Sequence, residues 1–166
     1  MSLAVWTLSQ IIDQISTKYE WTNSNITYGF PTSSKSMSFD EGGFAAFTAT
    51  QQASAKIALM TWNDLIKPSL SQVTLTSTSD YLVADIEFGT TPNNGGGVAG
   101  YPDEGSVWIT DESSGNNFGV GAWWFETLVH EVGHAFGLDH AGDYNGSAEV
   151  PFNTHDCEPY SIMSYF

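Results

Sequence analysis

The chain has 166 residues, of which 41% are apolar, and this is enough for one compact domain with a buried core and too many for a disordered chain. It contains 19 acidic residues against four basic ones, all lysines, so its formal net charge is -15. A phosphate backbone or an anionic membrane would be repelled by this charge, which excludes nucleic acid and membrane as partners. No apolar run approaches the roughly 18 residues of a membrane span, and the N-terminus lacks the basic region of an ordinary signal peptide.

Apolar spacing, capping residues and turn residues predict the elements in chain order. A helix is expected at 9–20 behind Ser9 as N-cap, and a second at 44–67, ending before a proline. Strands are expected at 26–30, 72–78, 82–89, 98–101 and 106–110. A helix over about 122–136 follows and ends at Gly137, and 138–166 is expected to be irregular. This order indicates an α+β domain with one mixed sheet backed by two long helices.

The last quarter of the chain contains the sequence HEVGHAFGLDH (130–140), which reads H-E-x-x-H-x-x-G-x-x-H. On a helix His130 and His134 lie about 40° and one turn apart, so two imidazoles can bind one ion. Gly137 permits a positive φ, so the chain can turn sharply and return His140 as a third ligand. Three nitrogen ligands leave the fourth tetrahedral position open, which is typical of a catalytic zinc and not of a structural one.

Glu131 lies about 100° from His130 around the helix, at the edge of the same side, where it can reach a metal-bound water without displacing it. The opposite face carries apolar residues that would anchor the helix in the core: Phe125, Leu128, Val129, Val132 and Phe136. The simpler interpretation is a set of hydrogen-bonded histidines on a polar face, but the ordered pattern is too specific to favour it. His155 lies outside the pattern, and no direct role is predicted for it.

These residues resemble the long zinc signature of the metzincin metalloproteases. The tail SIMSYF (161–166) resembles the Met-turn of that family, and HAGDYNG (140–146) together with the tail is most similar to the serralysin branch. Stretches that are similar to serralysin counterparts cover most of the chain: 26–30, 44–67 and 84–89. The chain departs from serralysins at Ala141, where they usually have Pro, and in lacking the glycine-rich calcium-binding β-roll that follows their Met-turn.

The resemblance implies a zincin-like α+β fold with a twisted, mixed and mostly parallel sheet of about five strands, two long helices and a zinc site in the cleft. It also implies a single catalytic domain over 1–166, with an N-terminal subdomain of about 1–137 and a short C-terminal subdomain of about 138–166. We expect the loop 143–160 to form the wall that sets cleavage preference.

The same resemblance implies a zinc-dependent endopeptidase with one catalytic Zn²⁺. Its ligands would be three residues: His130, His134 and His140. Glu131 would be the general base, and Met163 would form a hydrophobic floor beneath the zinc. Tyr165 would be a fifth ligand at rest and would swing away to hydrogen-bond the tetrahedral oxyanion. Ala99 and Gly100 would lie in the edge strand that pairs with an extended peptide substrate.

The resemblance also implies protein or peptide substrates, and we expect a secreted monomer. The alternatives are a zinc-bearing binding module without turnover and a catalytically impaired fragment, although Glu131 speaks against the former because metal binding alone does not need it. Calcium is left open by four scattered acids, which are usually just solvated: Asp103, Glu104, Asp111 and Glu112. The single cysteine, Cys157, cannot form an internal disulfide and is interpreted as an incidental thiol.

Overall fold

The computed structural model describes residues 3–34, 43–79, 83–91, 97–99, 105–110, 117–145 and 150–166. Its helices are α1 (Leu8–Ile15), α2 (Ala49–Asn63) and α3 (Trp123–Ala135). Its strands are β1 (Asn25–Gly29), β2 (Ala45–Ala46), β3 (Ser69–Gln72), β4 (Ile86–Thr91), β5 (Gly97–Ala99) and β6 (Ser106–Thr110). Within these ranges, no helix has the length and apolar character needed to cross a bilayer.

One sheet holds all the strands of these ranges. Its order is β3-β1-β4-β6-β5, and the two-residue β2 pairs with β4 beyond the point where β1 ends. The pairs β1–β3, β1–β4 and β4–β6 are parallel, whereas β2 and β5 run antiparallel to their neighbours. The expectation of a mixed, mostly parallel sheet is therefore confirmed, with β5 as the last strand on one side.

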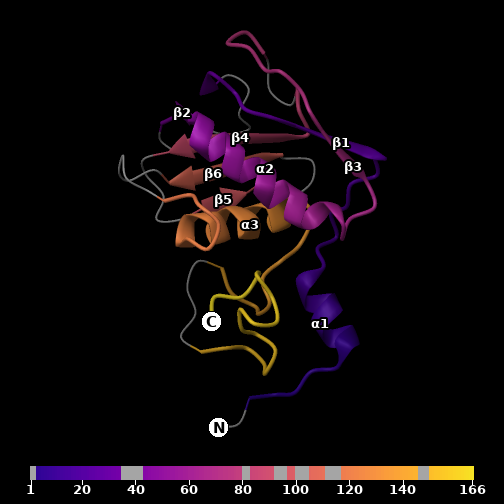
Figure 1. Cartoon of the computed structure of the whole chain (residues 1–166). Helices are drawn as coiled ribbons and strands as arrows, with labels where there is room; N and C mark the ends of the chain where they lie inside the picture. The colour runs from indigo at the N-terminus through magenta and orange to yellow at the C-terminus, as the bar shows by residue number, and fades with distance from the viewer. Residues whose placement is uncertain are drawn as a thin grey trace.

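The core lies between the sheet and the two longer helices. As Figure 1 shows, α2 lies across one face of the sheet, and α3 packs against α2 and against β5 and β6. The buried apolar cluster draws on the sheet and on both helices: Ile26, Leu59, Ile86, Phe88, Val107, Ile109, Leu128 and Val132. This packing makes α3 a rigid element with one side in the core and the other side free to carry polar groups.

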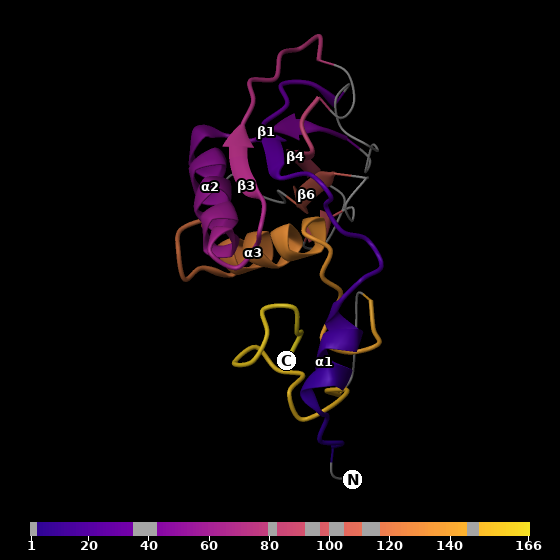
Figure 2. The ribbon, with the colours of Figure 1, turned by 90° about the vertical axis from the view of Figure 1, so that its right-hand side faces the viewer.

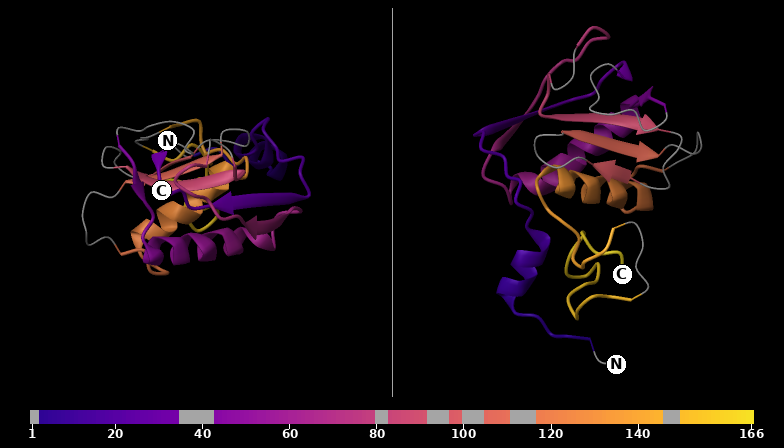
Figure 3. Two further views of the ribbon diagram at one scale, coloured as in Figure 1. Left: turned by 90° about the horizontal axis from the view of Figure 1, so that it is seen from above. Right: turned by 180° about the vertical axis from the view of Figure 1, so that it is seen from behind.

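The C-terminal segment lies on the far side of α3 from the sheet, next to α1 (Figures 1 and 2). The view from behind in Figure 3 shows the same arrangement, with α1 and the C-terminal segment side by side below α3. In the described part of 138–166 no helix or strand forms, as predicted, and Leu138 makes an isolated antiparallel bridge to Ser16. The N-terminal and C-terminal parts of the chain thus meet beneath α3.

Two helix starts differ from the predicted ones because threonines, and not the predicted residues, cap them. At α1 the N-cap is Thr7 rather than Ser9, and Thr7 forms a capping box with Gln10. The predicted helix 44–67 begins only at Ala49, because Thr48 and Gln51 form a second capping box. The residues before Thr48 are extended and form β2.

The strand predictions vary in accuracy. The strand at 106–110 is confirmed at both ends as β6, and 26–30 agrees with β1 to one residue at each end. The strand predicted at 72–78 is wrong, because β3 spans Ser69–Gln72 and the following chain closes a turn in which Ser79 N donates to Thr76 O at 3.1 Å. Of the strand predicted at 98–101, Gly100 and Tyr101 lie outside the described residues.

Candidate metal centre

Helix α3 places the first two histidines of the motif one turn apart on its polar side. The opposite side is held in the core by Leu128 and Val132, both fully buried, and by Phe125. His130 and His134 are themselves buried, at 8% and 7% exposure, beneath the C-terminal segment. The predicted apolar face of this helix is confirmed, and its packing fixes the direction in which the two imidazoles point.

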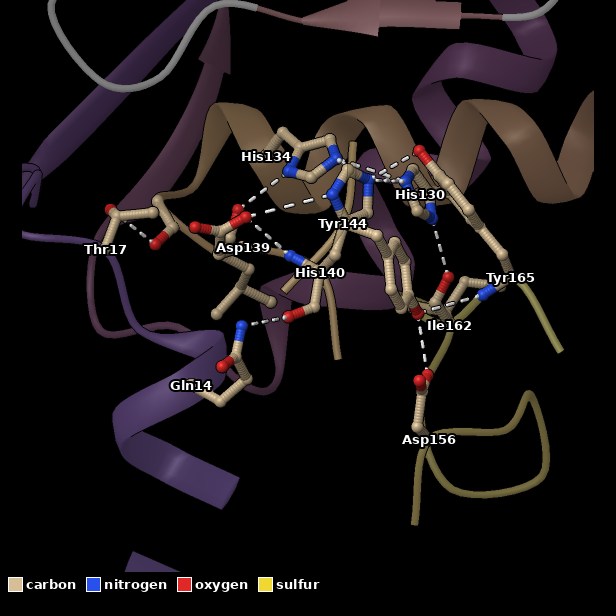
Figure 4. A network of polar contacts seen from close by, with 12 residues as sticks. Gln14, Thr17, His130, His134, Asp139, His140, Tyr144, Asp156, Ile162 and Tyr165 are labelled. Carbon is tan, nitrogen blue, oxygen red and sulfur yellow. Dashed lines mark hydrogen bonds and ion pairs between the residues drawn. The ribbon is translucent and has the colours of Figure 1, made fainter. Parts of the chain in front are cut away.

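The turn after α3 returns the chain so that His140 joins the other two histidines. Gly137 has φ of 94°, as the motif predicted, and Leu138 N donates to Gly133 O at 3.1 Å. The end of α1 supports this turn, since Thr17 Oγ1 donates to Gly137 O at 2.7 Å and Asp139 N donates to Ile15 O at 2.8 Å. Figure 4 shows Gln14 and Thr17 next to the loop that carries His140.

The three Nε2 atoms form a nearly equilateral triangle. The distance is 3.1 Å between His130 and His134, 3.2 Å between His134 and His140, and 3.3 Å between His130 and His140. Zinc binds imidazole nitrogen at about 2.0–2.1 Å, so two ligands at tetrahedral angles are about 3.3–3.4 Å apart. The triangle has the size that one shared tetrahedral ion requires.

The second nitrogen of each α3 histidine explains why these contacts are not ordinary hydrogen bonds. Nδ1 of His130 lies 2.7 Å from Ile162 O, and Nδ1 of His134 lies 2.8 Å from Leu138 O. A carbonyl oxygen only accepts, so each Nδ1 carries the proton and each Nε2 presents a lone pair. Lone pairs converging at this distance repel one another unless a cation lies between them, and this is how metal-binding histidines are usually oriented.

Burial keeps these imidazoles neutral. Desolvation lowers the pKa of His130 to about 4 and the pKa of His134 to about 3, while the backbone hydrogen bonds at Nδ1 oppose the shift. Desolvation also lowers the pKa of His140, against the pull of the Asp139 carboxylate. Neutral imidazole is the form that binds metal, so the site is ready for an ion at neutral pH.

Glu131 follows His130 on α3 and is also buried, at 6% exposure. Its desolvation raises the pKa of the carboxyl group to about 8. A divalent cation held by the neighbouring histidines would favour the carboxylate and oppose this shift. A carboxyl group whose pKa lies near neutrality can both accept and return a proton, which suits a general base.

The Met-turn residue lies directly against α3. Met163 is 1% exposed, and its Sδ would be only 2.6 Å from a Cβ added at Gly133, the glycine between the two histidines of the helix. Met163 O accepts a hydrogen bond from Ala141 N at 3.1 Å, next to His140. Gly133 was not singled out from the sequence, and its lack of a side chain is what allows this close contact.

The tail also brings a phenol to the histidines. Tyr165 Oη lies 2.8 Å from His140 Nε2, and the Tyr165 ring lies 5.8 Å from the His130 ring, nearly parallel to it. Tyr165 remains 39% exposed, so this side chain lies at the open side of the site. Figure 4 shows its hydroxyl group pointing toward the imidazoles.

Two residues near the site gave no strong signal in the sequence. Tyr144 packs its ring at 5.4 Å from His140 and 4.9 Å from Tyr165, and its hydroxyl donates to Asp156 Oδ1 at 2.6 Å. Burial and the Asp156 hydrogen bond raise the pKa of Tyr144 to about 12. Tyr144 lies within the stretch that resembles serralysins, which is the only sequence signal for it, and Asp156 has none.

The other predicted residues are placed as follows. Ala99 ends β5, the last strand on its side of the described sheet. Gly100 lies outside the described residues. The four acids considered for calcium also lie outside them: Asp103, Glu104, Asp111 and Glu112. His155 does not belong to the histidine group and contacts the Tyr160 ring at 5.2 Å. Cys157 is a free, half-buried thiol.

Comparison with known proteins agrees with this geometry. Residues 44–166 match the sequence profile of the reprolysin-like metallopeptidase family M12B. Serralysin A from Dickeya chrysanthemi is 30% identical over 161 residues, which are 87% of this chain and 32% of the relative. Serralysin G from the same organism is 30% identical over 97% of this chain and 39% of its own length, and metalloprotease AprA from Pseudomonas entomophila is 31% identical over 86% and 32%.

These matches confirm the predicted likeness to serralysins. The chain spans about a third of the length of these curated relatives. The zinc signature, the Met-turn and helix α3 all fall inside the segment that the family profile covers.

Proposed function

We propose that this chain, which belongs to the reprolysin-like metallopeptidase family M12B, is a zinc-dependent endopeptidase domain that hydrolyses peptide bonds in protein substrates. The observation that carries the proposal is the convergence of three histidine Nε2 atoms within 3.3 Å of one another, with the buried Glu131 next to His130 on the same helix. A site that only binds metal would not need the Glu131 carboxyl group next to its histidine ligands.

The proposed ligands are His130, His134 and His140. A zinc ion bound there would supply a Lewis acid for the scissile carbonyl and a water of lowered pKa. Glu131 would take the proton from the attacking water and later return it to the leaving amine. The raised pKa of Glu131 supports this double role, because a carboxylate of low pKa would be a weak base for the attacking water.

Tyr165 would stabilise the negative charge that develops on the scissile carbonyl oxygen. Its phenol lies 2.8 Å from His140 Nε2, so it is within reach of the ligand sphere and can hydrogen-bond a substrate oxygen there. The role of fifth zinc ligand at rest also stays part of this proposal. Met163, buried against Gly133, would form the hydrophobic floor beneath the zinc.

An extended peptide would bind along β5. This strand ends at Ala99 and is the last strand on its side of the described sheet, so a substrate strand could add to its open edge. The involvement of Gly100 rests on the serralysin resemblance alone. We extend the same resemblance to a secreted monomer, and to a division into subdomains near residue 137, where α3 has ended and the C-terminal segment begins.

The test compares wild-type protein with Glu131→Gln in a casein-hydrolysis assay, each after zinc loading and after chelation. Wild-type protein should lose its activity with the chelator, and Glu131→Gln should bind one equivalent of zinc yet lose activity by about 10³-fold or more, because no base remains. The exposed Glu20→Gln provides a matched control for the same chemical change away from the site. A zinc-loaded wild-type protein without turnover would refute the proposal and favour a zinc-bearing binding module.

A further inference from the structure

A buried carboxylate holds together the segment that carries Tyr165. Asp156 is 1% exposed and is not among the histidine ligands. Its Oδ1 accepts from Tyr144 Oη at 2.6 Å and from Ser164 Oγ at 2.7 Å, and its Oδ2 accepts from Phe152 N at 2.7 Å. Burying a carboxylate is costly, and here three hydrogen-bond donors drawn from separate parts of the C-terminal segment offset that cost.

This network leads directly to the backbone of Tyr165. The Tyr144 hydroxyl, whose proton goes to Asp156, accepts from Tyr165 N at 3.3 Å. The Ser164 hydroxyl, which donates to Asp156, accepts from Phe166 N at 3.2 Å. The peptide groups on both sides of the Tyr165 side chain are therefore tied, through one hydroxyl each, to the same carboxylate. Figure 4 shows the connection from Tyr165 through Tyr144 to Asp156.

The rings extend the same restraint to the side chain. Tyr144 lies between two groups of the site, with its ring 4.9 Å from Tyr165 and 5.4 Å from His140. Such offset ring contacts favour one relative placement of the three rings. Gly142 leaves room for this arrangement, because a Cβ at that position would collide with Tyr144 Cε1 and would lie 2.8 Å from Asp156 Oδ2.

We propose that Asp156 and Tyr144 are positioning residues, which fix the backbone of Tyr165 so that its phenol, at rest beside His140, can reach the substrate oxyanion. This inference rests on the proposed peptidase function. Neither residue needs to touch substrate, because each acts through the Tyr165 backbone and ring. Their contribution belongs to the transition state and should appear in kcat and not in KM.

The decisive experiment is a double-mutant cycle between Tyr144→Phe and Tyr165→Phe, with kcat and KM measured on a peptide substrate. Tyr144→Phe removes one oxygen and should lower kcat about tenfold with KM within about twofold, as for a reacting group displaced by less than 1 Å. Tyr165→Phe should lower kcat about 10- to 100-fold. In the Tyr165→Phe background, Tyr144→Phe should cost nothing further, because no phenol remains to be positioned. Tyr19→Phe, at a tyrosine that is 39% exposed and lies outside the C-terminal segment, is the matched control and should be unchanged.

Two measurements separate positioning from general loss of structure. The Kd of zinc, from competition with a chelating dye, should be the same for Tyr165→Phe with and without Tyr144→Phe, because the three histidine ligands are unchanged. The Kd of a phosphinic peptide, which imitates the tetrahedral intermediate, should rise about tenfold in Tyr144→Phe and show the same non-additivity in calorimetry. Asp156→Asn should follow the same pattern, and if it does not fold, Tyr144→Phe carries the test alone.

The outcomes are distinct. Additive losses in the two tyrosine variants, a zinc Kd that Tyr144→Phe changes in the Tyr165→Phe background, or an unchanged kcat in Tyr144→Phe would overturn the positioning role while leaving the peptidase intact. A wild-type protein that neither cleaves peptides nor binds the phosphinic peptide would overturn the proposed function, and the positioning role with it.

Discussion

The contact between Gly133 and the Met-turn predicts that Gly133→Ala destabilises the protein although it improves helix propensity. In the structure, an alanine Cβ at this position would lie 2.6 Å from Met163 Sδ and 3.1 Å from Trp62 Cζ2. Ordinary contacts between such atoms are about 3.5–4.0 Å, so the sulfur must retreat by about 1 Å. Neither neighbour is free to move, since Met163 is 1% exposed and Trp62 Nε1 donates to Val129 O at 3.1 Å.

The magnitude follows from two opposing effects. Overpacking of a filled core costs about 1–3 kcal/mol, and the rigid surroundings of Gly133 favour the upper part of that range. Replacing glycine by alanine inside a helix regains about 1 kcal/mol. The net loss in the free energy of unfolding should be about 1–2 kcal/mol, which for a chain of this size lowers Tm by about 2–8 °C.

The assay is urea denaturation of Gly133→Ala in the wild-type and in the Met163→Ala backgrounds, with chelator present so that metal affinity does not enter. Met163→Ala alone should cost about 2–5 kcal/mol, because it leaves a cavity. In that background Gly133→Ala should be neutral or slightly stabilising, giving a coupling of at least about 1 kcal/mol. Equal effects of Gly133→Ala in both backgrounds would show that the thioether does not pack on this glycine.

Two further outcomes are expected. Gly137→Ala should lower the free energy of unfolding by about 1–3 kcal/mol in urea denaturation, because φ of 94° strains any side chain there, and an unchanged midpoint would contradict this. The second outcome concerns the metal-free protein when the pH is lowered from about 7 to about 5.5. His130 and His134 then take up protons only in the unfolded chain, because their pKa values are lowered in the folded one, and this reduces stability. Glu131 is protonated mainly in the folded chain, because its pKa is raised there, and this adds stability. Metal-free Glu131→Gln lacks the second effect and should lose about 2 kcal/mol more than metal-free wild type over that interval, whereas parallel curves would refute the raised pKa of Glu131.

The parts of the protein that sequence reasoning located correctly are those whose structure depends on neighbours along the chain. His130 and His134 share a helix face because of the helical repeat, and Gly137 ends that helix because the turn needs a positive φ. The strand 106–110 has Val, Trp and Ile at its centre, residues that favour strands, and was placed to the residue. By contrast, the true start of α2 depends on Thr48 and on pairing between β2 and β4, which an alanine-rich stretch does not reveal.

The histidine pattern was sufficient to indicate a metal site, because three ligands and a turn glycine lie within eleven consecutive residues and their geometry follows from helix periodicity. Local periodicity says nothing about segments that meet across the fold. Thr17 Oγ1 donates to Gly137 O across 120 residues, and Asp156 accepts hydrogen bonds from Tyr144, Phe152 and Ser164. A short stretch of sequence therefore determines which residues are the metal ligands. The support of His140 and the placement of the Tyr165 phenol depend on packing among distant segments, because burial and hydrogen-bond satisfaction select one arrangement there.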